Sequence, residues 1–549
     1  MNKNNDLLGK WLSSLAAAAV IVLMPCQQIE AQEGSVDQPS SMKRQIAEDQ
    51  TSVTRNARPL VPIALQGAHR LTLRDFVRLA MQENDTVRRE ELEARIAAAA
   101  IENAESVFEP ILSGSVARER SFTRTDAVEQ AQYSSLSEYR SRTNTIDIGV
   151  EGLLQTGARV KVGYAQEDPT NDLQKNVNQG HEVKTELEVS VTQPLLKNFG
   201  PRVTSTTVRI AEYDAEIAEQ KRRQVMMETA TKAIIGYQEL QKAQMLWQLR
   251  RESLGKSQRL LDEMVQLMQA GRQPESAVLD AEANSIQRQV ALRTAESALQ
   301  TAVVKAQDLL LGSDDTRLPV QILAAESLSD PITNRVDRSD RMVQQALKEH
   351  PEIQSARLGT QREEERLVYA DNQRLVQLDF SGSYSLNGLD RHGDSSLADA
   401  MKRDHSDWRM GLELKVPLGG GWKTRSEYNA ALHKRDQAAL EMHVAKKRLI
   451  NGLQERMNAV DAARDQVAYA RQALRLRERM LKSEQSMFKG GKSSLRTVII
   501  REEGVLQARE QVLEKRFELA RAQALLDMSR GVLLEMFGVE PTPVQREAS

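Results

Sequence analysis

The feature that most constrains this chain is a junction at which a β-strand passes directly into a very long helix. In residues 185–193, leucine and valine side chains alternate with polar ones, which is the period of a half-buried strand. Pro194 then removes a backbone donor and ends the ladder, and the helical pattern that begins beyond Arg202 meets no proline until Pro274. The chain is therefore expected to leave a sheet and continue as one uninterrupted helix.

The same junction recurs in the second half of the chain. Residues 411–416 alternate in the same way, Pro417 ends the strand, and the next proline is Pro541. Both junctions end in glycine, at Gly200 and at Gly421. Two copies of one uncommon junction indicate an internal repeat, which has to be settled before the fold class.

The composition favours long, exposed helices over an enzyme core. Of the 549 residues only 4% are aromatic and 28% are charged. A net charge of −2 gives no basic excess, so nucleic acid is not an expected partner. The histidines lack metal-ligand spacing, no nucleophile motif occurs, and Trp422 stands where a phosphate-binding loop needs glycine before lysine. No enzyme activity, metal or cofactor is expected.

The N-terminus has the pattern of an export signal. Lys3 and Lys10 precede an apolar run over residues 11–24, and Ala31 offers a small residue for cleavage. Cys26 is the only cysteine, and the residues before it fit a lipid-attachment site poorly, so cleavage is favoured and lipidation is the alternative. We expect a signal peptide over residues 1–31 and a flexible segment over 32–68.

Six strands are expected, four of them in the first half of the chain. A tight turn at residues 155–157 joins the second and third strands, whereas the other two connections in this group, 121–143 and 168–184, are long and polar. This alternation, with strands near ~9–11 residues, is typical of outer-membrane β-barrels and occurs also in soluble sandwiches. The expected strands are 110–120, 144–154, 159–167, 185–193, 376–387 and 407–416.

Long helices fill the rest of each half. The helix expected over residues 203–269 would be about 100 Å long at ~1.5 Å per residue. A shorter return helix follows it, and the lengths indicate a tube wall of paired helices. The expected helices are 72–106 (capped by Thr72), 203–269, 275–311, 424–489 and 494–536. The expected repeats are 69–312 and 341–538, separated by a linker at 313–340 and followed by a tail at 539–549.

This order of elements, over roughly residues 70–540, resembles the TolC family of outer membrane efflux proteins. The resemblance is carried by three stretches. They are Gln193-Pro194-Leu195-Leu196 with Phe199-Gly200, the weaker copy Val416-Pro417-Leu418 with Gly419-Gly-Gly421, and Val278-Leu-Asp-Ala281 beyond the first tip glycine. Each motif is short, but their repetition in order around such long helices is specific.

The resemblance implies a mainly α protein with a membrane β-barrel portion. Three protomers would share one β-barrel in the outer membrane, continuous with an α-helical tunnel in the periplasm. Such a homotrimer contacts outer membrane lipid, a periplasmic membrane-fusion adaptor and an inner-membrane pump of the RND, ABC or MFS type. The implied function is efflux or type I secretion. The cargo and the pump type do not follow from the sequence.

The strand count departs from the family pattern and leaves the size of the barrel open. Family members have two strands per repeat and twelve per trimer, whereas six per protomer would give eighteen. The alternative function is that of a periplasmic coiled-coil, adaptor-like or structural protein without a pore. Such a protein would not need paired strands of barrel length that emerge from long helices.

The resemblance also implies roles for the ends of the helical hairpins. Family tip turns meet the adaptor, which assigns that contact to Ala270, Gly271, Arg272, Gly490, Gly491, Lys492 and Ser493. Acidic residues beyond the tip glycine narrow the family's periplasmic end, and Asp280 matches one such position. Three carboxylates in a ring would favour cations. The corresponding Thr497 and Ile500 of the second repeat are uncharged, with Arg496, Arg501, Glu502 and Glu503 nearby.

Overall fold

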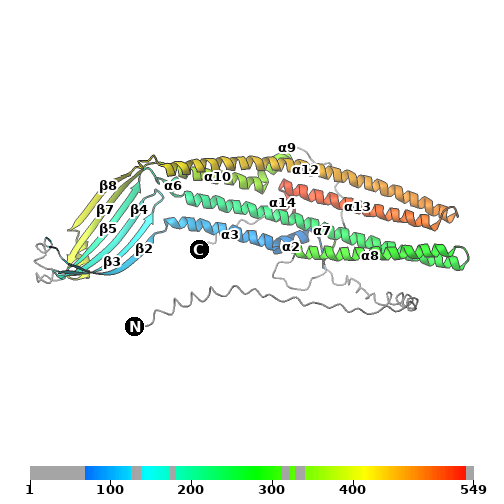
Figure 1. Ribbon diagram of the computed structural model, residues 1–549, viewed down its shortest axis with the longest axis horizontal. Coiled ribbons are helices and arrows are strands. Elements are labelled where there is room, and N and C mark those ends of the chain that lie inside the picture. The colour runs from blue at the N-terminus through cyan, green and yellow to red at the C-terminus, as the bar shows by residue number, and fades with distance from the viewer. Residues whose placement is uncertain are drawn as a thin grey trace, which may run out of the picture. The chain divides into compact units, whose positions relative to one another are not determined.

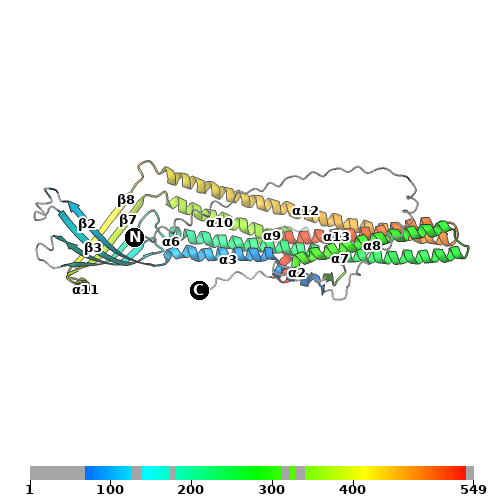
Figure 2. The same cartoon turned by 60° about the horizontal axis from the view of Figure 1, so that its bottom comes forward.

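The computed structural model describes residues 69–124, 126, 128, 138–172, 181–310, 322–327 and 340–539. The expected signal peptide, the segment 32–68, most of the linker 313–340 and the tail beyond Val539 lie outside these residues. Within the unit formed by residues 67–549, long antiparallel helices adjoin a six-stranded sheet (Figures 1 and 2). None of the helices in the described ranges is long and apolar enough to cross a membrane.

Each half of the chain contributes one long helix with two shorter helices packed along it. In the first half α3 and α8 lie end to end along α7, and in the second half α10 and α13 lie along α12 (Figure 1). The contacts of α10 and α13 with α7 join the two halves. The bounds are α3 Asp85–Glu105, α7 Thr206–Gln269, α8 Glu275–Leu310, α10 Pro351–Asn372, α12 Trp422–Lys489 and α13 Leu495–Arg530.

Small and apolar residues at helical spacing hold these helices together. In α7, Ala230, Ala233 and Tyr237 are fully buried, and alanine lets the backbones approach closely. The hydroxyl of Tyr237 donates to the carbonyl of Leu71 at 2.9 Å, and its ring lies 5.5 Å from Phe76 of α2 (Leu73–Glu83). A second core runs along α12, where the buried residues Leu449, Leu453, Met457, Val460, Ala463 and Val467 repeat every three or four positions.

Three helices expected to be continuous are broken, each for a local reason. The helix expected over 72–106 breaks at Asn84, whose side chain accepts from the amide of Thr86 at 3.0 Å and caps α3; Thr72 caps α2 as expected. The helix expected over 494–536 breaks at Gly531, which has φ +78° and separates α13 from α14 (Leu533–Phe537). Only glycine adopts this conformation without steric cost.

The third break divides the helix expected from residue 203 into α6 (Pro201–Thr204) and α7. Three consecutive hydroxyls lie at this break, and each donates to the carbonyl four residues earlier. They are Thr204 to Gly200 at 3.0 Å, Ser205 to Pro201 at 2.7 Å and Thr206 to Arg202 at 2.9 Å. Such bonds compete with the helix ladder and bend it.

All six expected strands are present in one antiparallel sheet, in the order β2-β3-β4-β5-β7-β8. Several extend further than expected, so the two long connections are shorter than 121–143 and 168–184. The bounds are β2 Ile111–Arg124, β3 Glu138–Leu153, β4 Arg159–Asn171, β5 Val183–Pro194, β7 Gln377–Asp390 and β8 Ser406–Lys415. We call the strand ends away from the helices distal.

The short elements that the sequence pattern does not predict include β1, β6 and α11. Strand β1 (His69–Leu71) pairs in parallel with β6 (Ile322–Ala324), which lies inside the range assigned to the linker. Three residues are too few for a period-two pattern. Helix α11 (Gly393–Met401) packs on β7 and β5. It lies against Gly388, where a Cβ would come 2.0 Å from the carbonyl oxygen of Ser396.

His350 occupies the position in the second half that Asn84 occupies in the first. Its Nδ1 accepts from the amide of Glu352 at 3.3 Å and caps α10, with α9 (Asp340–Glu349) just before it. Burial lowers the pKa of His350 below its ordinary value. Because the unfolded chain then binds a proton more readily, His350 should cost stability as the pH falls below about 6.5.

We therefore expect His350→Asn to keep the cap and to weaken the acid sensitivity. The apparent Tm should fall less between pH 7.5 and pH 5.5 in this variant than in the wild type, measured by circular dichroism. His433, exposed on α12, supplies the matched control His433→Asn, which should keep the wild-type pH dependence. An unchanged slope in His350→Asn would contradict the assignment.

Candidate functional site

The sheet has one polar face and one apolar face. Side chains alternate along every strand, and the register places those of one kind together across the sheet. On the polar face, carboxylates outnumber basic groups within the described strands. The carboxylates are Glu119, Asp147, Glu151, Glu167, Glu186, Glu188, Asp379, Asp407 and Glu413, and the basic residues are Arg159, Lys161, Lys184, Arg409 and Lys415.

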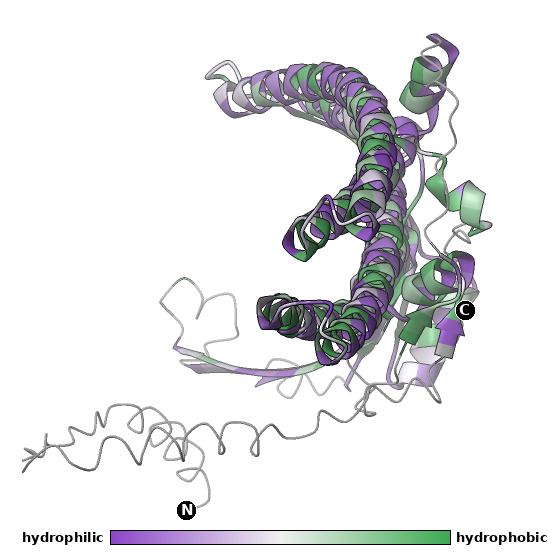
Figure 3. Ribbon diagram, turned by 90° about the vertical axis from the view of Figure 1, so that its right-hand side faces the viewer, coloured by the Kyte–Doolittle hydropathy of each residue, from purple (hydrophilic) through white to green (hydrophobic). Residues whose placement is uncertain are grey.

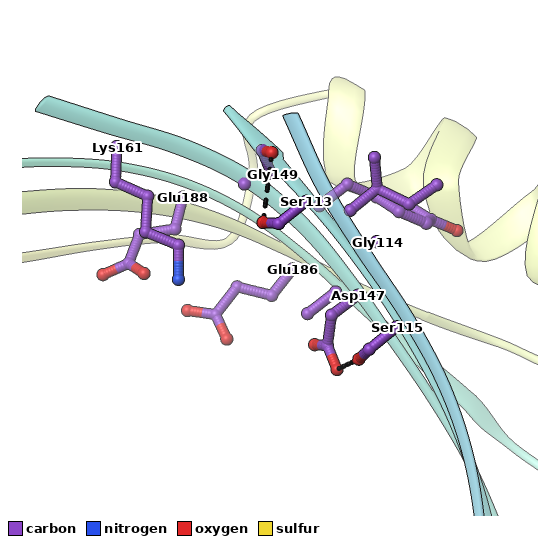
Figure 4. A pocket seen from close by; sticks show the side chains of 12 residues that line it. Ser113, Gly114, Ser115, Asp147, Gly149, Lys161, Glu186 and Glu188 are labelled. Atoms are coloured by element: carbon purple, nitrogen blue, oxygen red, sulfur yellow. Dashed lines mark hydrogen bonds between the residues drawn. The ribbon is translucent and has the colours of Figure 1, made fainter. Parts of the chain in front are cut away.

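A hollow lies on this face where two glycines oppose each other across strands β3 and β4 (Figure 4). Gly149 and Gly163 form this cross-strand pair, so no side chain fills the space. The hydroxyl of Ser115 donates to Asp147 at 3.2 Å beside it, and Lys161 and Glu188 line another side. The hollow is open and is lined by charged and hydroxyl side chains.

The opposite face carries an exposed apolar band. Its members include Leu112 and Val116, 72% and 81% exposed, and Trp408, 72% exposed. An exposed apolar surface of this extent marks contact with a membrane or another protein. The band comprises Leu112, Val116, Ile146, Ile148, Val150, Val160, Val162, Tyr164, Leu187, Val189, Val191, Phe380, Tyr384, Leu386, Trp408, Met410, Leu412 and Leu414.

The band is oblique to the strands. Its most distal member on β8 is Trp408, and the row of paired residues through Trp408 reaches Leu112 on β2. On β2, however, the band continues four residues further, to Val116. At ~3.3 Å per residue and ~4.8 Å between strands, this drift corresponds to an angle of about 30°. Strands of outer-membrane barrels tilt by roughly 35–45°.

The strand-to-helix corners lie where the sequence placed them. Pro194 is the last residue of β5, and Gly200, with φ +95°, precedes α6. Gly421 precedes α12 with φ +63°, four residues beyond Pro417. The β3–β4 turn packs beneath the first corner, where the amide of Gly200 donates to Thr156 at 3.1 Å. This contact sets the turn at the helical end of the sheet.

The tips of the two helical hairpins have the same backbone geometry. The amide of Arg272 donates to Leu267 at 2.8 Å, and the amide of Lys492 donates to Met487 at 2.9 Å. In each turn the amide of the glycine, Gly271 or Gly491, donates a second hydrogen bond back to the helix. These glycines have φ +69° and +71°. This pattern is a Schellman C-cap, in which glycine occupies the left-handed position.

The backbone conformation distinguishes Gly490 from Gly491, for which the sequence predicted the same role. Gly490 has φ −85° and corresponds to Ala270, which has φ −79°. Any residue can adopt this conformation. Of the expected tip residues, only Gly271 and Gly491 therefore depend on being glycine. Ser493 is bonded to Glu484 of α12, which ties the second turn to its own helix.

The two tips contact each other through α8 and α13. Met264, Ala277, Ala281 and Leu495 form a small core between them. Further along, Arg288 of α8 is 4% exposed and forms an ion pair with Glu503 of α13. Burial raises the pKa of Glu502 beside this pair. The sequence alone does not predict this pair, because pairing between residues so distant in the chain leaves no local pattern.

Asp280 is exposed on α8 beside the buried residues Ala277 and Ala281. At ~100° per residue, Asp280 and Glu282 lie on opposite sides of that buried stripe. Because Gly271 and Gly491 occupy the same turn position, Asp280 corresponds to Ile500, which is 59% exposed.

Comparisons with known proteins agree with this architecture. Residues 342–538 match the family described as outer membrane efflux protein. A search of curated proteins finds no match. Among solved structures, CusC is similar with a TM-score of 0.61 and 13% identity, over 85% of this chain and 93% of CusC.

Two outer membrane channels are similar to the same extent. CmeC from Campylobacter jejuni gives a TM-score of 0.58 and 14% identity, over 84% of this chain and 85% of that chain. The open state of MtrE from Neisseria gonorrhoeae gives a TM-score of 0.57 and 12% identity, over 85% of this chain and 94% of that chain. These structures have the same fold of long helices continuing into a sheet.

Proposed function

Because residues 342–538 match the outer membrane efflux protein family, we propose that three copies of the chain form an export channel through the outer membrane. The observation that carries this proposal is the two-faced sheet. Its apolar band would contact lipid and its polar face would line a water-filled lumen, the arrangement that a membrane barrel requires. The oblique course of the band supports the same orientation, since it matches strands tilted in a bilayer.

The free edges of the sheet define how the copies would join. Within the described residues β2 pairs only with β3, and β8 only with β7. Unpaired strand edges are templates for another strand, and no unpaired edge can remain within a lipid bilayer. Pairing β8 of one protomer with β2 of the next would close a barrel of eighteen strands. Viewed along their axes, the helices form an open arc (Figure 3), as one third of a tunnel would.

The helical hairpins would project into the periplasm, with their tips against a membrane-fusion adaptor and, through it, an inner-membrane pump. The tip turns at residues 270–272 and 490–493 end the hairpins away from the sheet (Figure 1). Such a system exports small molecules by efflux or proteins by type I secretion. A tunnel lined by hydrated charge selects little, so the choice of cargo belongs to the pump.

A topology experiment tests the proposal. Val128 lies at the distal end of the sheet and is 70% exposed, whereas Gln155 lies in the β3–β4 turn. In intact cells, Val128→Cys should react with an impermeant maleimide, and Gln155→Cys should react only after the outer membrane is permeabilised. The protein should also fractionate with the outer membrane as a trimer. Labelling of Gln155→Cys in intact cells would invert the topology, and a purely periplasmic fraction would favour the adaptor-like alternative.

We propose that Asp280 lines the periplasmic constriction. If so, Asp280→Asn should lower cation selectivity in planar bilayers, most strongly at 0.01 M salt, where the Debye length is ~30 Å against ~3 Å at 1 M. Glu282→Gln, on the other side of the buried stripe, should change selectivity much less. Equal effects from both substitutions would place the constriction elsewhere, with residues 496–503 next in line.

A further inference from the structure

A cluster of arginines occupies the apolar face of the sheet, immediately beyond the distal edge of the apolar band. Arg118 and Arg120 of β2 follow Val116 on this face, and Arg140 and Arg142 of β3 lie beside them. All four side chains are exposed. Glu119, between the first two, alternates to the polar face. The strand therefore separates its charges by sign between the two faces.

The register places two arginines of this cluster opposite each other, and the carboxylate of Asp168 lies on the same face two positions from the partner of Arg142. Arg120 lies directly opposite Arg142, and like charges in that position repel each other. Among the described residues, no carboxylate forms an ion pair with Arg118, Arg120 or Arg142. Arg140 is different, since it pairs with Glu138 at 3.3 Å and stacks on Phe122 at 5.0 Å.

We propose that Arg118, Arg120 and Arg142 bind the phosphate groups of an outer-leaflet lipid. This inference rests on the proposed membrane function, which places the apolar band in the hydrocarbon. Arg118 is two residues beyond Val116, about 7 Å along the strand, where headgroup phosphates begin. Guanidinium groups match phosphate oxygens in bidentate geometry. Val116 and Ile146 below would contact the acyl chains, which makes a lipid the occupant and not free phosphate.

The test uses the full chain, purified as the trimer in non-ionic detergent. Binding of diphosphoryl lipid A and of monophosphoryl lipid A is measured by native mass spectrometry over a concentration series. Replacing the three arginines by glutamine should weaken binding of diphosphoryl lipid A by about a hundredfold, at roughly fivefold per residue. The wild type should bind the monophosphoryl form more weakly.

The matched control removes the same charge from the other face. Lys161→Gln, Lys184→Gln and Arg409→Gln together lie on the polar face, and this variant should bind lipid like the wild type. Equal affinities in the two triple variants would overturn the proposal, as would equal affinity for the two lipids. Displacement of bound lipid by a tenfold excess of inorganic phosphate would also overturn it.

Planar-bilayer recordings separate this inference from the proposed function. The wild type and the arginine triple variant should form channels of the same conductance, since the arginines lie outside the lumen. The polar-face variant should also form channels, with a conductance that changes because its three charges line the lumen. If the wild type forms no channel, the membrane function fails first. If all three form channels and bind lipid equally, only the lipid site is excluded.

Discussion

Replacing Gly271 and Gly491 by valine should abolish export while the trimer remains assembled. Both residues have positive φ, which costs a β-branched side chain about 1–3 kcal/mol at each position. The strain falls on turns at the ends of the hairpins, whereas the cores along α7 and α12 lie elsewhere. The tip surface that we assign to the adaptor should therefore be lost before the fold.

The structure supplies a matched control for this substitution. Gly490→Ala adds a side chain at φ −85°, where the first tip already carries Ala270, and should be neutral or slightly stabilising. Export is measured by complementation of a strain that lacks its own copy of the channel, and assembly by gel electrophoresis without heating. We expect a loss of at least tenfold in the valine double variant and none in Gly490→Ala. Loss of the trimer together with export would assign these glycines to folding.

Local chemistry explains why most of the fold could be predicted from the sequence. Strand alternation, the prolines that end β5 and β8, and glycines such as Gly271 all act within a few residues of themselves, so each leaves a local signal. Repetition of the strand–proline–helix junction raised weak signals to a specific resemblance. The six strands and both tip turns followed from these signals.

What the sequence did not predict depends on partners distant in the chain or on side chains that compete with the backbone. The break at Ser205 needs three hydroxyls to choose carbonyl partners, and threonine and serine also occur inside helices. The fit of α11 against Gly388 becomes apparent only when β7 is in place. The pairing of Arg288 with Glu503 joins residues more than two hundred positions apart.

Breaking the Arg288–Glu503 pair should have the largest effect on stability of the single substitutions that we propose at the helical end. Arg288 is almost fully buried, its Nε donates to Asn284 at 3.3 Å, and it connects the two hairpins through Glu503. Arg288→Met would leave the partly buried carboxylates beside it without their cation. Breaking a buried pair costs ~3–5 kcal/mol, and the lower end applies because Glu503 is 32% exposed.

The stability lost in Arg288→Met should depend on pH in a defined direction. Burial already raises the pKa of Glu502 and of Glu510, and the charge of Arg288 opposes that rise. Without Arg288 both groups would bind protons more readily in the folded state. The variant should therefore lose more stability at pH 8 than at pH 5, because the carboxylates are ionised at the higher pH.

Arg293→Met is the control for Arg288→Met. Arg293 lies on the same helix, 47% exposed, and pairs with Glu296 of its own helix at 3.0 Å, so its loss should cost less than about 0.5 kcal/mol. Thermal unfolding at the two pH values and single-channel conductance are measured for both variants. If the Arg288–Glu503 pair holds the hairpin tips together, only Arg288→Met should raise conductance, because its tips can separate. The same Tm and conductance in both variants would show that the apolar core around Met264 and Leu495 joins the hairpins without the ion pair.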